Sequence, residues 1–177
     1  MVEVVGLERK GHVALITLNR PEARNALSPE MLVRLADTWT KVRDDSEIRV
    51  AVVTGAGDKA FCSGADLGRL IPLMSRARPP EDEWDQRLLA DGETLGRGLL
   101  RTFDVVKPVI AAINGHAIAG GMELVQGTDL RIASTDAKFG VQEVKWAIFP
   151  GGGSTVRLPR TAAGNVALRS IKRRARA

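Results

Sequence analysis

The sequence contains few of the residues that build disulfides and metal sites. Its 177 residues include one cysteine, Cys62, and two histidines, His12 and His116. One thiol cannot form an internal disulfide or supply a cysteine-based metal site. No run approaches the roughly 18 continuous apolar residues of a membrane-spanning helix, and the N-terminus lacks the basic, apolar and small-residue order of a signal peptide. We therefore expect a cytoplasmic protein that does not enter a membrane.

Positive charge is in excess, but only at one end of the chain. The net charge of +5 is matched by five basic residues with no acid among them: Arg169, Lys172, Arg173, Arg174 and Arg176. Such a run at a terminus is more often a solvated end than a binding site. We therefore do not expect nucleic-acid binding, and 44% hydrophobic with 27% charged residues fits an ordinary globular domain.

The N-terminal quarter of the chain predicts a hairpin and a helix. Residues 2–7 and 12–18 are rich in β-branched side chains, and Gly11 between them indicates an antiparallel turn. Ser28 can cap a helix whose first residue is a proline, and apolar residues follow at helical spacing to about Asp44. The chain thus begins with paired strands and a long helix.

Two continuous apolar runs decide the fold class. Residues 48–54 and 109–113 have the length and composition of strands buried on both faces. Each precedes a glycine-containing turn and a short helical pattern, so strands and helices alternate as in parallel α/β folds. The charged connection 76–85 and the helical pattern 84–105 indicate an insertion over the sheet edge. We predict one α/β domain.

The segment 61–67 is the first candidate for chemistry. It follows a predicted strand and loop, and we expect a helix to begin near Ala65. The unpaired N–H groups and positive dipole end of a first helical turn stabilise negative charge on a bound oxygen. A tight turn with Asp66 as a capping acid explains the same residues, and the segment by itself favours that alternative.

The segment 114–123 is the second candidate, with paired glycines where a helix should begin. Gly120 lets a ligand approach the backbone closely because it has no Cβ, and Glu123 falls about one turn into the helix. A capping-box acid that reaches back to its own helix start is an equally good interpretation of Glu123.

Glu143 adds a second carboxylate shortly before a glycine-rich run. Two carboxylates that face one pocket can hold a water between them, one accepting a proton and the other returning a proton to carbon. An apolar pocket would raise their pKa values and separate their roles. In isolation, a surface glutamate preceding Lys145 is the simpler interpretation.

Three other features are weaker candidates. Residues 55–60 fit the loose dinucleotide pattern G-x-G-x-x-A, but no helical pattern follows at once, so a plain loop is the better interpretation. Cys62 has no evident histidine partner and fits a small buried residue better than a nucleophile. His116 fits a loop or core position, and glycines 151–153 lack the Lys-Ser/Thr pair of a phosphate loop.

Five segments together resemble the crotonase superfamily and, within it, the enoyl-CoA hydratase/isomerase family. They are residues 19–27, 61–67, 114–123, 129–133 and 139–153, in that family's order and approximate spacing. The resemblance implies a crotonase-like core, a spiral of ββα-like turns, and a substrate bound as a coenzyme A thioester. It implies no metal and no cofactor besides the coenzyme A of the substrate.

The same resemblance implies roles for individual residues. The backbone N–H groups of Ala65 and Gly120 match the oxyanion hole that polarises the thioester carbonyl. Glu123 and Glu143 match the two acids that hydratases place around the attacking water, whereas isomerases of the family usually keep one, so the implied activity is that of an enoyl-CoA hydratase. The residues implied in substrate binding are Arg24, Ala26, Ala65, Asp66, Leu67, Gly68 and Gly120.

The C-terminal end departs from the family pattern. We divide the chain into a crotonase-like core, 1–160, and a basic tail, 161–177, that does not match the family. We expect a C-terminally truncated member without the helical region that builds trimer contacts in the family, which leaves the family's homo-trimer or hexamer open. Gln142 stands where hydratases often have proline.

Two alternative functions remain open on the sequence alone. The same fold and oxyanion hole serve isomerases, acyl-CoA hydrolases and decarboxylases of the superfamily. A catalytically silent crotonase-like protein would instead bind a partner or nucleic acid through the basic tail.

Overall fold

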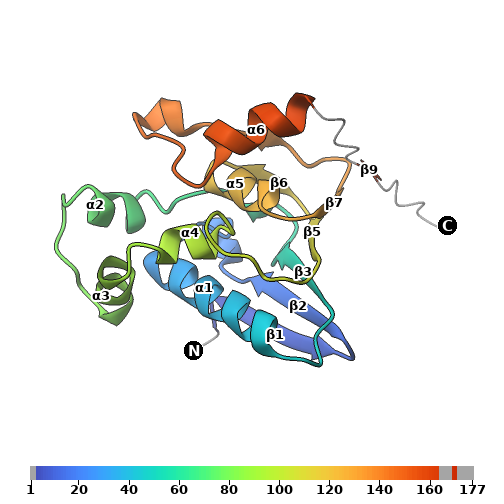
Figure 1. Cartoon of the computed structure of the whole chain (residues 1–177). Helices are drawn as coiled ribbons and strands as arrows, with labels where there is room; N and C mark the ends of the chain where they lie inside the picture. The colour runs from blue at the N-terminus through green and yellow to red at the C-terminus, as the bar shows by residue number, and fades with distance from the viewer. Residues whose placement is uncertain (1–2, 164–168, 171–177) are drawn as a thin grey trace.

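The computed structural model describes residues 3–163 and 169–170 and contains two sheets (Figure 1). The larger sheet has the order β1 (Val5–Lys10), β2 (Val13–Leu18), β3 (Val50–Gly55), β5 (Val109–Ile113), β7 (Leu130–Ala133), β9 (Arg169–Ser170). The smaller sheet has the order β4 (Ala60–Cys62), β6 (His116–Ile118), β8 (Phe139–Gly140). The pair β1 and β2 is antiparallel, and the other pairs are parallel.

The helices connect the two sheets in a repeated order. They are α1 (Pro29–Asp44), α2 (Leu70–Met74), α3 (Glu83–Ala90), α4 (Thr94–Gly98), α5 (Gly120–Gln126) and α6 (Ser154–Ala163), with 3-10 turns η1 (Pro21–Ala23) and η2 (Glu143–Trp146). A strand of the larger sheet is followed by a strand of the smaller sheet and then by a helix, as in β3–β4–α2 and β5–β6–α5. This rhythm confirms the predicted α/β class and its ββα-like turns.

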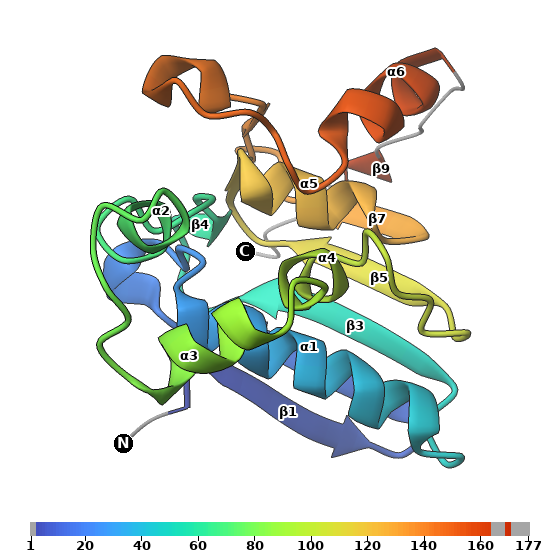
Figure 2. The ribbon, with the colours of Figure 1, turned by 60° about the vertical axis from the view of Figure 1, so that its left-hand side comes forward.

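The predicted N-terminal hairpin and α1 both form, although the first strand of the hairpin is Val5–Lys10 and not residues 2–7. Ser28 caps α1 by accepting a hydrogen bond at Oγ from Met31 N at 3.2 Å, and the helix ends at Asp44. Trp39 is fully buried, and its Nε1 donates to Gly98 O at 3.1 Å, which fastens α1 to α4. Helices α3 and α4 occupy the predicted insertion and lie against α1, which runs along β1 and β3 (Figure 2).

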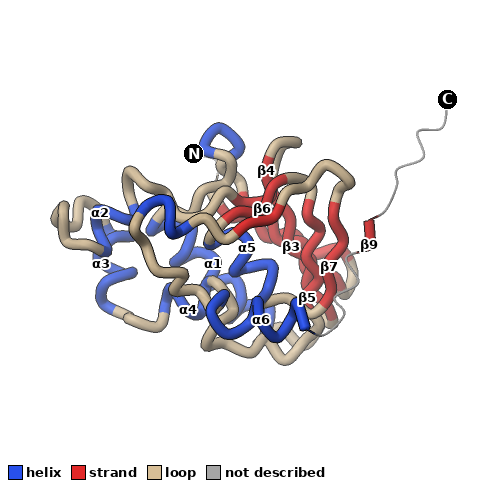
Figure 3. Tube along the Cα trace, turned by 90° about the horizontal axis from the view of Figure 1, so that it is seen from above, coloured by secondary structure: helices blue, strands red, loops and turns tan. Residues whose placement is uncertain are grey.

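The central strands are covered more on one face than on the other. In β3 and β5, buried residues such as Val53 and Ala111 alternate with partly exposed neighbours. The prediction of strands buried on both faces is therefore wrong. Viewed from above, the helices gather on one side of the strands, so only alternate side chains are fully covered (Figure 3).

The helix expected to begin near Ala65 begins instead at Leu70. The cause is Asp66, whose Oδ1 accepts from the N–H groups of Gly68 and Arg69, both at 3.0 Å. A side chain that bonds to nearby backbone N–H groups favours a turn over a continuous helix. The donor of Ala65 therefore belongs to a loop.

Two findings bear on the expectations for the tail and for membranes. Of the tail's basic residues, only Arg169 is described, in β9 beside β7; Lys172, Arg173, Arg174 and Arg176 lie outside the described residues. No helix in the described ranges is long and apolar enough to cross a membrane.

Candidate active site

A cavity of about 580 Å³ lies between the loop after β4, the segment around η1 and the segment around η2. Its lining residues are Ala23, Arg24, Ala26, Ser63, Ala65, Asp66, Leu67, Gly68, Ile118, Ala119, Gln142, Glu143, Trp146 and Ile148. Seven of the site residues expected from the sequence are among them. Gly120 and Glu123 do not line this cavity, although both lie next to residues that do.

The loop that carries Ala65 is fixed by backbone pairing with Leu27. Leu27 N donates to Gly64 O at 2.8 Å, and Asp66 N donates to Leu27 O at 3.0 Å. Gly64 has a φ of +96°, which L side chains rarely adopt, so glycine suits this position. No acceptor for Ala65 N–H is found in the described part of the chain. The loop thus presents a backbone donor at a fixed place beside the cavity.

Asp66 holds the same loop from its other side. Its Oδ2 lies 3.0 Å from Arg20 Nη1, which also donates to Ala26 O at 2.8 Å. The guanidinium of Arg20 therefore connects Ala26 and Asp66, two residues that line the cavity. Asp66 is a structural acid here, as the capping alternative predicts, although its role includes this ion pair with a residue far away in the sequence.

Gly120 begins α5 directly opposite Ala65. A first helical residue has an N–H group with no acceptor inside its own helix. A Cβ placed on Gly120 would lie 3.8 Å from Ala65 N, and a Cβ placed on Gly64 would lie 3.3 Å from Gly120 N. The preceding residue, Ala119, has a φ of 50° and is held by Ala119 N donating to Gly140 O at 2.7 Å. The two loops therefore converge, as the resemblance to the family implies.

Glu123 projects from the first turn of α5 toward the turn that precedes α6. Its Oε2 accepts from Gly152 N at 2.9 Å and its Oε1 from Ser154 N at 3.1 Å. The side chain is 4% exposed. The capping-box interpretation is therefore wrong, because the carboxylate binds the start of another helix. Glycine suits position 152, since a Cβ there would lie 2.5 Å from Glu123 Oε2 and would push the carboxylate aside.

Glu143 is a buried carboxylate at the first residue of η2. The residue is 6% exposed, and neither Oε1 nor Oε2 has a hydrogen-bond partner among the described residues. Burial raises the pKa of Glu143, and the nearby charge of Glu123 raises it further, while the backbone N–H groups of Glu143 and Gln142 oppose the shift. The simple surface-glutamate interpretation is therefore wrong.

The cavity wall includes residues that the sequence patterns did not single out. Trp146 and Ile148 follow Glu143 in and after η2, and Ile118 comes from β6. Ser154, which binds Glu123, also escaped notice. Helical spacing could have suggested that η2 turns Trp146 to the side of Glu143, but only the fold brings Ile118 opposite them.

The weaker candidates take structural places. Burial raises the pKa of the Cys62 thiol to about 12, which keeps it protonated and poorly nucleophilic. His116 accepts at Nδ1 from Lys138 N at 3.2 Å at an exposed position. Within the described ranges, no group of three or more His, Cys, Asp or Glu residues is arranged to hold a metal ion.

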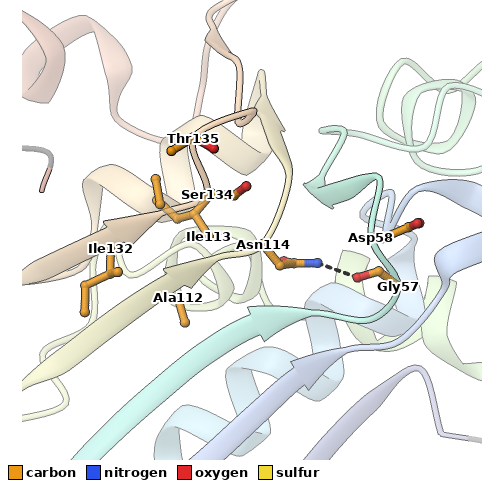
Figure 4. A pocket seen from close by; sticks show the side chains of 9 residues that line it. Gly57, Asp58, Ala112, Ile113, Asn114, Ile132, Ser134 and Thr135 are labelled. Carbon is orange, nitrogen blue, oxygen red and sulfur yellow. Dashed lines mark hydrogen bonds between the residues drawn. The ribbon is translucent and has the colours of Figure 1, made fainter. Parts of the chain in front are cut away.

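The dinucleotide-like pattern at residues 55–60 forms a loop that leads into β4 and not into a helix. It borders another cavity, of about 520 Å³, at the carboxyl ends of β3, β5 and β7 (Figure 4). There Asn114 Nδ2 donates to Gly57 O at 2.8 Å, and Asn114 Oδ1 accepts from Gly55 N at 3.0 Å. Asn114 thus pins the loop, and no helix start is available for a pyrophosphate.

Comparison with known proteins gives consistent matches. Residues 8–172 match the family model described as enoyl-CoA hydratase/isomerase. The chain is 46% identical to the (E)-benzylidenesuccinyl-CoA hydratase of Thauera aromatica, over 94% of this chain and 61% of the relative. It is 45% identical to an enoyl-CoA hydratase of Mycobacterium tuberculosis, over 87% of this chain and 55% of that protein.

A solved structure agrees with these relatives. The crystal structure of a carnitinyl-CoA hydratase from Mycobacterium avium superposes with a TM-score of 0.76 at 37% identity, covering 91% of this chain and 57% of that one. The chain therefore spans little more than half the length of the proteins that it matches.

Proposed function

The chain belongs to the enoyl-CoA hydratase/isomerase family, and on that premise we propose that it adds water across the 2,3 double bond of an enoyl-CoA thioester. The observation that carries the proposal is a pair of buried glutamates in unlike surroundings behind two converging backbone donors. Glu123 accepts two backbone hydrogen bonds, whereas Glu143 accepts none from the described residues. Such a pair suits one proton acceptor and one proton donor.

The two backbone donors polarise the thioester carbonyl. In this proposal the carbonyl oxygen accepts from the N–H groups of Ala65 and Gly120, which draws electrons toward that oxygen and leaves C3 electrophilic. A positioned donor of this kind contributes about 3–4 kcal/mol to the stability of the charged transition state. The separate anchoring of the two loops, by Leu27 and by Gly140, keeps both donors in place before substrate binds.

The glutamates divide the proton transfers. Glu123 takes a proton from water as the water oxygen bonds to C3, and the double-bond electrons move to form the thioester enolate. The carbonyl re-forms as C2 takes a proton from Glu143, whose pKa is raised by burial and by Glu123. Return of the proton from Glu123 to Glu143 completes the cycle. Each acid–base contribution is worth about 10²- to 10⁴-fold in rate, and no metal or redox cofactor takes part.

Coenzyme A occupies the cavity mouth in this proposal. Arg24 is exposed beside the cavity and can meet the phosphates, while Ala26 and the loop from Asp66 to Gly68 line the path toward Ala65. Leu67 is 42% exposed, which leaves an apolar side chain available to the pantetheine arm. We also propose that the protein is cytoplasmic and forms a homo-trimer or hexamer like its family. Sedimentation of the full chain tests the oligomeric state.

The test is the loss of conjugated enoyl-thioester absorbance when crotonyl-CoA is added to the purified full chain. We expect hydration by the native chain and a rate at least about 10²-fold lower for the Glu123→Gln, Glu143→Gln double variant. Product analysis must show the 3-hydroxyacyl thioester, because an isomerase or a hydrolase would give a different product. Equal turnover by both proteins would refute the assignment.

A further inference from the structure

A second side chain of α5 reaches the turn that holds Glu123. Gln126 lies three residues after Glu123, so both project from the same face of the helix. Gln126 is 6% exposed, and its Nε2 donates to Ser154 Oγ at 3.1 Å. Its Oε1 is buried without a partner among the described residues. Among the described residues, Ser154 is therefore the one hydrogen-bond partner of the Gln126 side chain.

Ser154 links this amide to the proposed proton acceptor. The residue is 4% exposed at the start of α6, and while its Oγ accepts from Gln126, its backbone N donates to Glu123 Oε1 at 3.1 Å. Two side chains of α5 therefore hold the same residue of α6, one through its hydroxyl and the other through its backbone. A displacement of the Ser154 backbone would disturb both bonds together.

The turn before α6 is closely packed at Gly152. A Cβ on Gly152 would lie 2.6 Å from Leu99 Cδ1 as well as 2.5 Å from the Glu123 carboxylate. Gly152 N and Ser154 N each donate to one oxygen of the Glu123 carboxylate. The direction of the carboxylate depends on the placement of this turn.

We propose that Gln126 is a positioning residue for Glu123, acting through Ser154. The inference rests on the proposed function, in which Glu123 accepts a proton from the attacking water. The side chain of Gln126 donates to Ser154 and not to Glu123, so its loss should alter the orientation of Glu123 more than substrate binding. A misplacement of about 1 Å in a catalytic group can cost about 10²-fold in rate. Loss of the hydrogen bond between Gln126 and Ser154 can therefore lower the rate, although Gln126 does not touch the reacting atoms.

The experiment compares Gln126→Met with the native full chain. Methionine fills a similar volume and removes the donor. We expect kcat for crotonyl-CoA hydration to fall by about 10- to 100-fold, with KM changed less than about 2-fold. Gln86→Met is the matched control, because Gln86 is exposed on α3 and its replacement should leave both parameters unchanged.

Ser154→Ala provides the second variant, since it removes the hydroxyl and keeps the backbone donor. If the link acts as a unit, Gln126→Met and Ser154→Ala together should lower kcat no further than either alone. Hydrogen exchange of the 152–154 segment supplies a readout that does not need activity, and it should quicken in both variants while α1 stays unchanged.

The outcomes separate this inference from the proposed function. A native chain without hydratase activity overturns the proposed function and this role with it. A native chain that hydrates crotonyl-CoA, beside a folded Gln126→Met variant with unchanged kcat, overturns the positioning role alone. A fall in kcat that is additive with that of Ser154→Ala, or without faster exchange at 152–154, overturns the route through Ser154.

Discussion

Two carboxylates of this chain are buried almost equally, but one accepts several hydrogen bonds and the other accepts none from the described residues. Asp85, in α3, is 0% exposed and accepts from Arg78 Nη2 at 2.9 Å, Arg78 Nη1 at 2.5 Å and Glu81 N at 3.0 Å. Glu143 is 6% exposed and has no hydrogen-bond partner among the described residues. Burial is thus common to both, and the donors around them differ.

The pKa values follow the donors. The hydrogen bond from Arg78 lowers the pKa of Asp85 despite its burial, whereas burial and the charge of Glu123 raise the pKa of Glu143. A carboxylate satisfied by the protein stabilises structure, and a carboxylate left unsatisfied costs stability. The comparison therefore indicates that Asp85 serves the fold, and it supports the proposal that Glu143 takes part in catalysis.

Asp85 also supports the cavity-lining loop from Ala65 to Gly68 at a distance. The guanidinium that it holds donates from Nε and Nη2 to Arg69 O at 3.1 and 2.9 Å. Arg69 directly follows the loop from Ala65 to Gly68, and its own N–H is held by Asp66. The ion pair of Asp85 and Arg78 therefore fixes the far end of the segment that we propose to line the coenzyme A path.

The largest expected effect comes from Glu143→Gln. In the proposed reaction it should lower kcat by about 10²- to 10⁴-fold, since the proton donor is lost. The free energy of unfolding should not decrease, because the change removes a buried carboxylate that had no partner to lose. Turnover of crotonyl-CoA and urea unfolding of the same preparation check both statements. A variant that is fully active, or clearly less stable, would break the contrast with Asp85.

Asp85→Asn should show the reverse pattern and a smaller energy. We expect the free energy of unfolding to fall by about 1–3 kcal/mol, because asparagine carries no charge and replaces one of the two oxygens that accept from Arg78 with an NH2 group. Any change in turnover should follow from looser substrate binding, seen as a higher KM. Asp37→Asn is the matched control, since Asp37 pairs with Arg87 on the surface at 2.9 Å and should matter little. Equal stability of the two variants would contradict the structural role of Asp85.

The sequence located one of these carboxylates and missed the other. Glu143 stands in a segment whose order and spacing resemble a known family, so its role could be expected before its burial was known. Asp85 belongs to the charged connection 76–85, which composition alone marks as solvated. Its burial depends on Arg78 folding back over Arg69, a tertiary arrangement that no local pattern encodes.

The same limit explains the error at Ala65. Local signals predicted β1, β2, β3 and β5, α1 and the glycine start of α5, because each depends on neighbouring residues. The loop at Ala65 is set instead by Leu27 and by the pair of Arg20 with Asp66, which come from distant parts of the chain. Convergence of Ala65 with Gly120 was expected from the resemblance, and the supporting contacts were not.

The smallest expected effect is the pH dependence of stability, and it should have opposite signs at the two carboxylates. Glu143 has a raised pKa in the folded state, so the folded protein binds more protons than the unfolded chain above about pH 4.3, and stability falls as pH rises toward the folded pKa. Asp85 has a lowered pKa, so its stabilisation is present above about pH 3.9 and is lost as pH falls toward the folded pKa.

Two variants can isolate these contributions. Glu143→Gln should abolish the loss of stability that occurs as pH rises above about 4.3. Asp85→Asn should abolish the loss that occurs as pH falls below about 3.9. Each variant should leave the other pH dependence unchanged. Urea unfolding from about pH 3 to about pH 8 measures both slopes. If both variants changed the same slope, the surroundings of the two carboxylates would not differ in the way that their hydrogen bonds indicate.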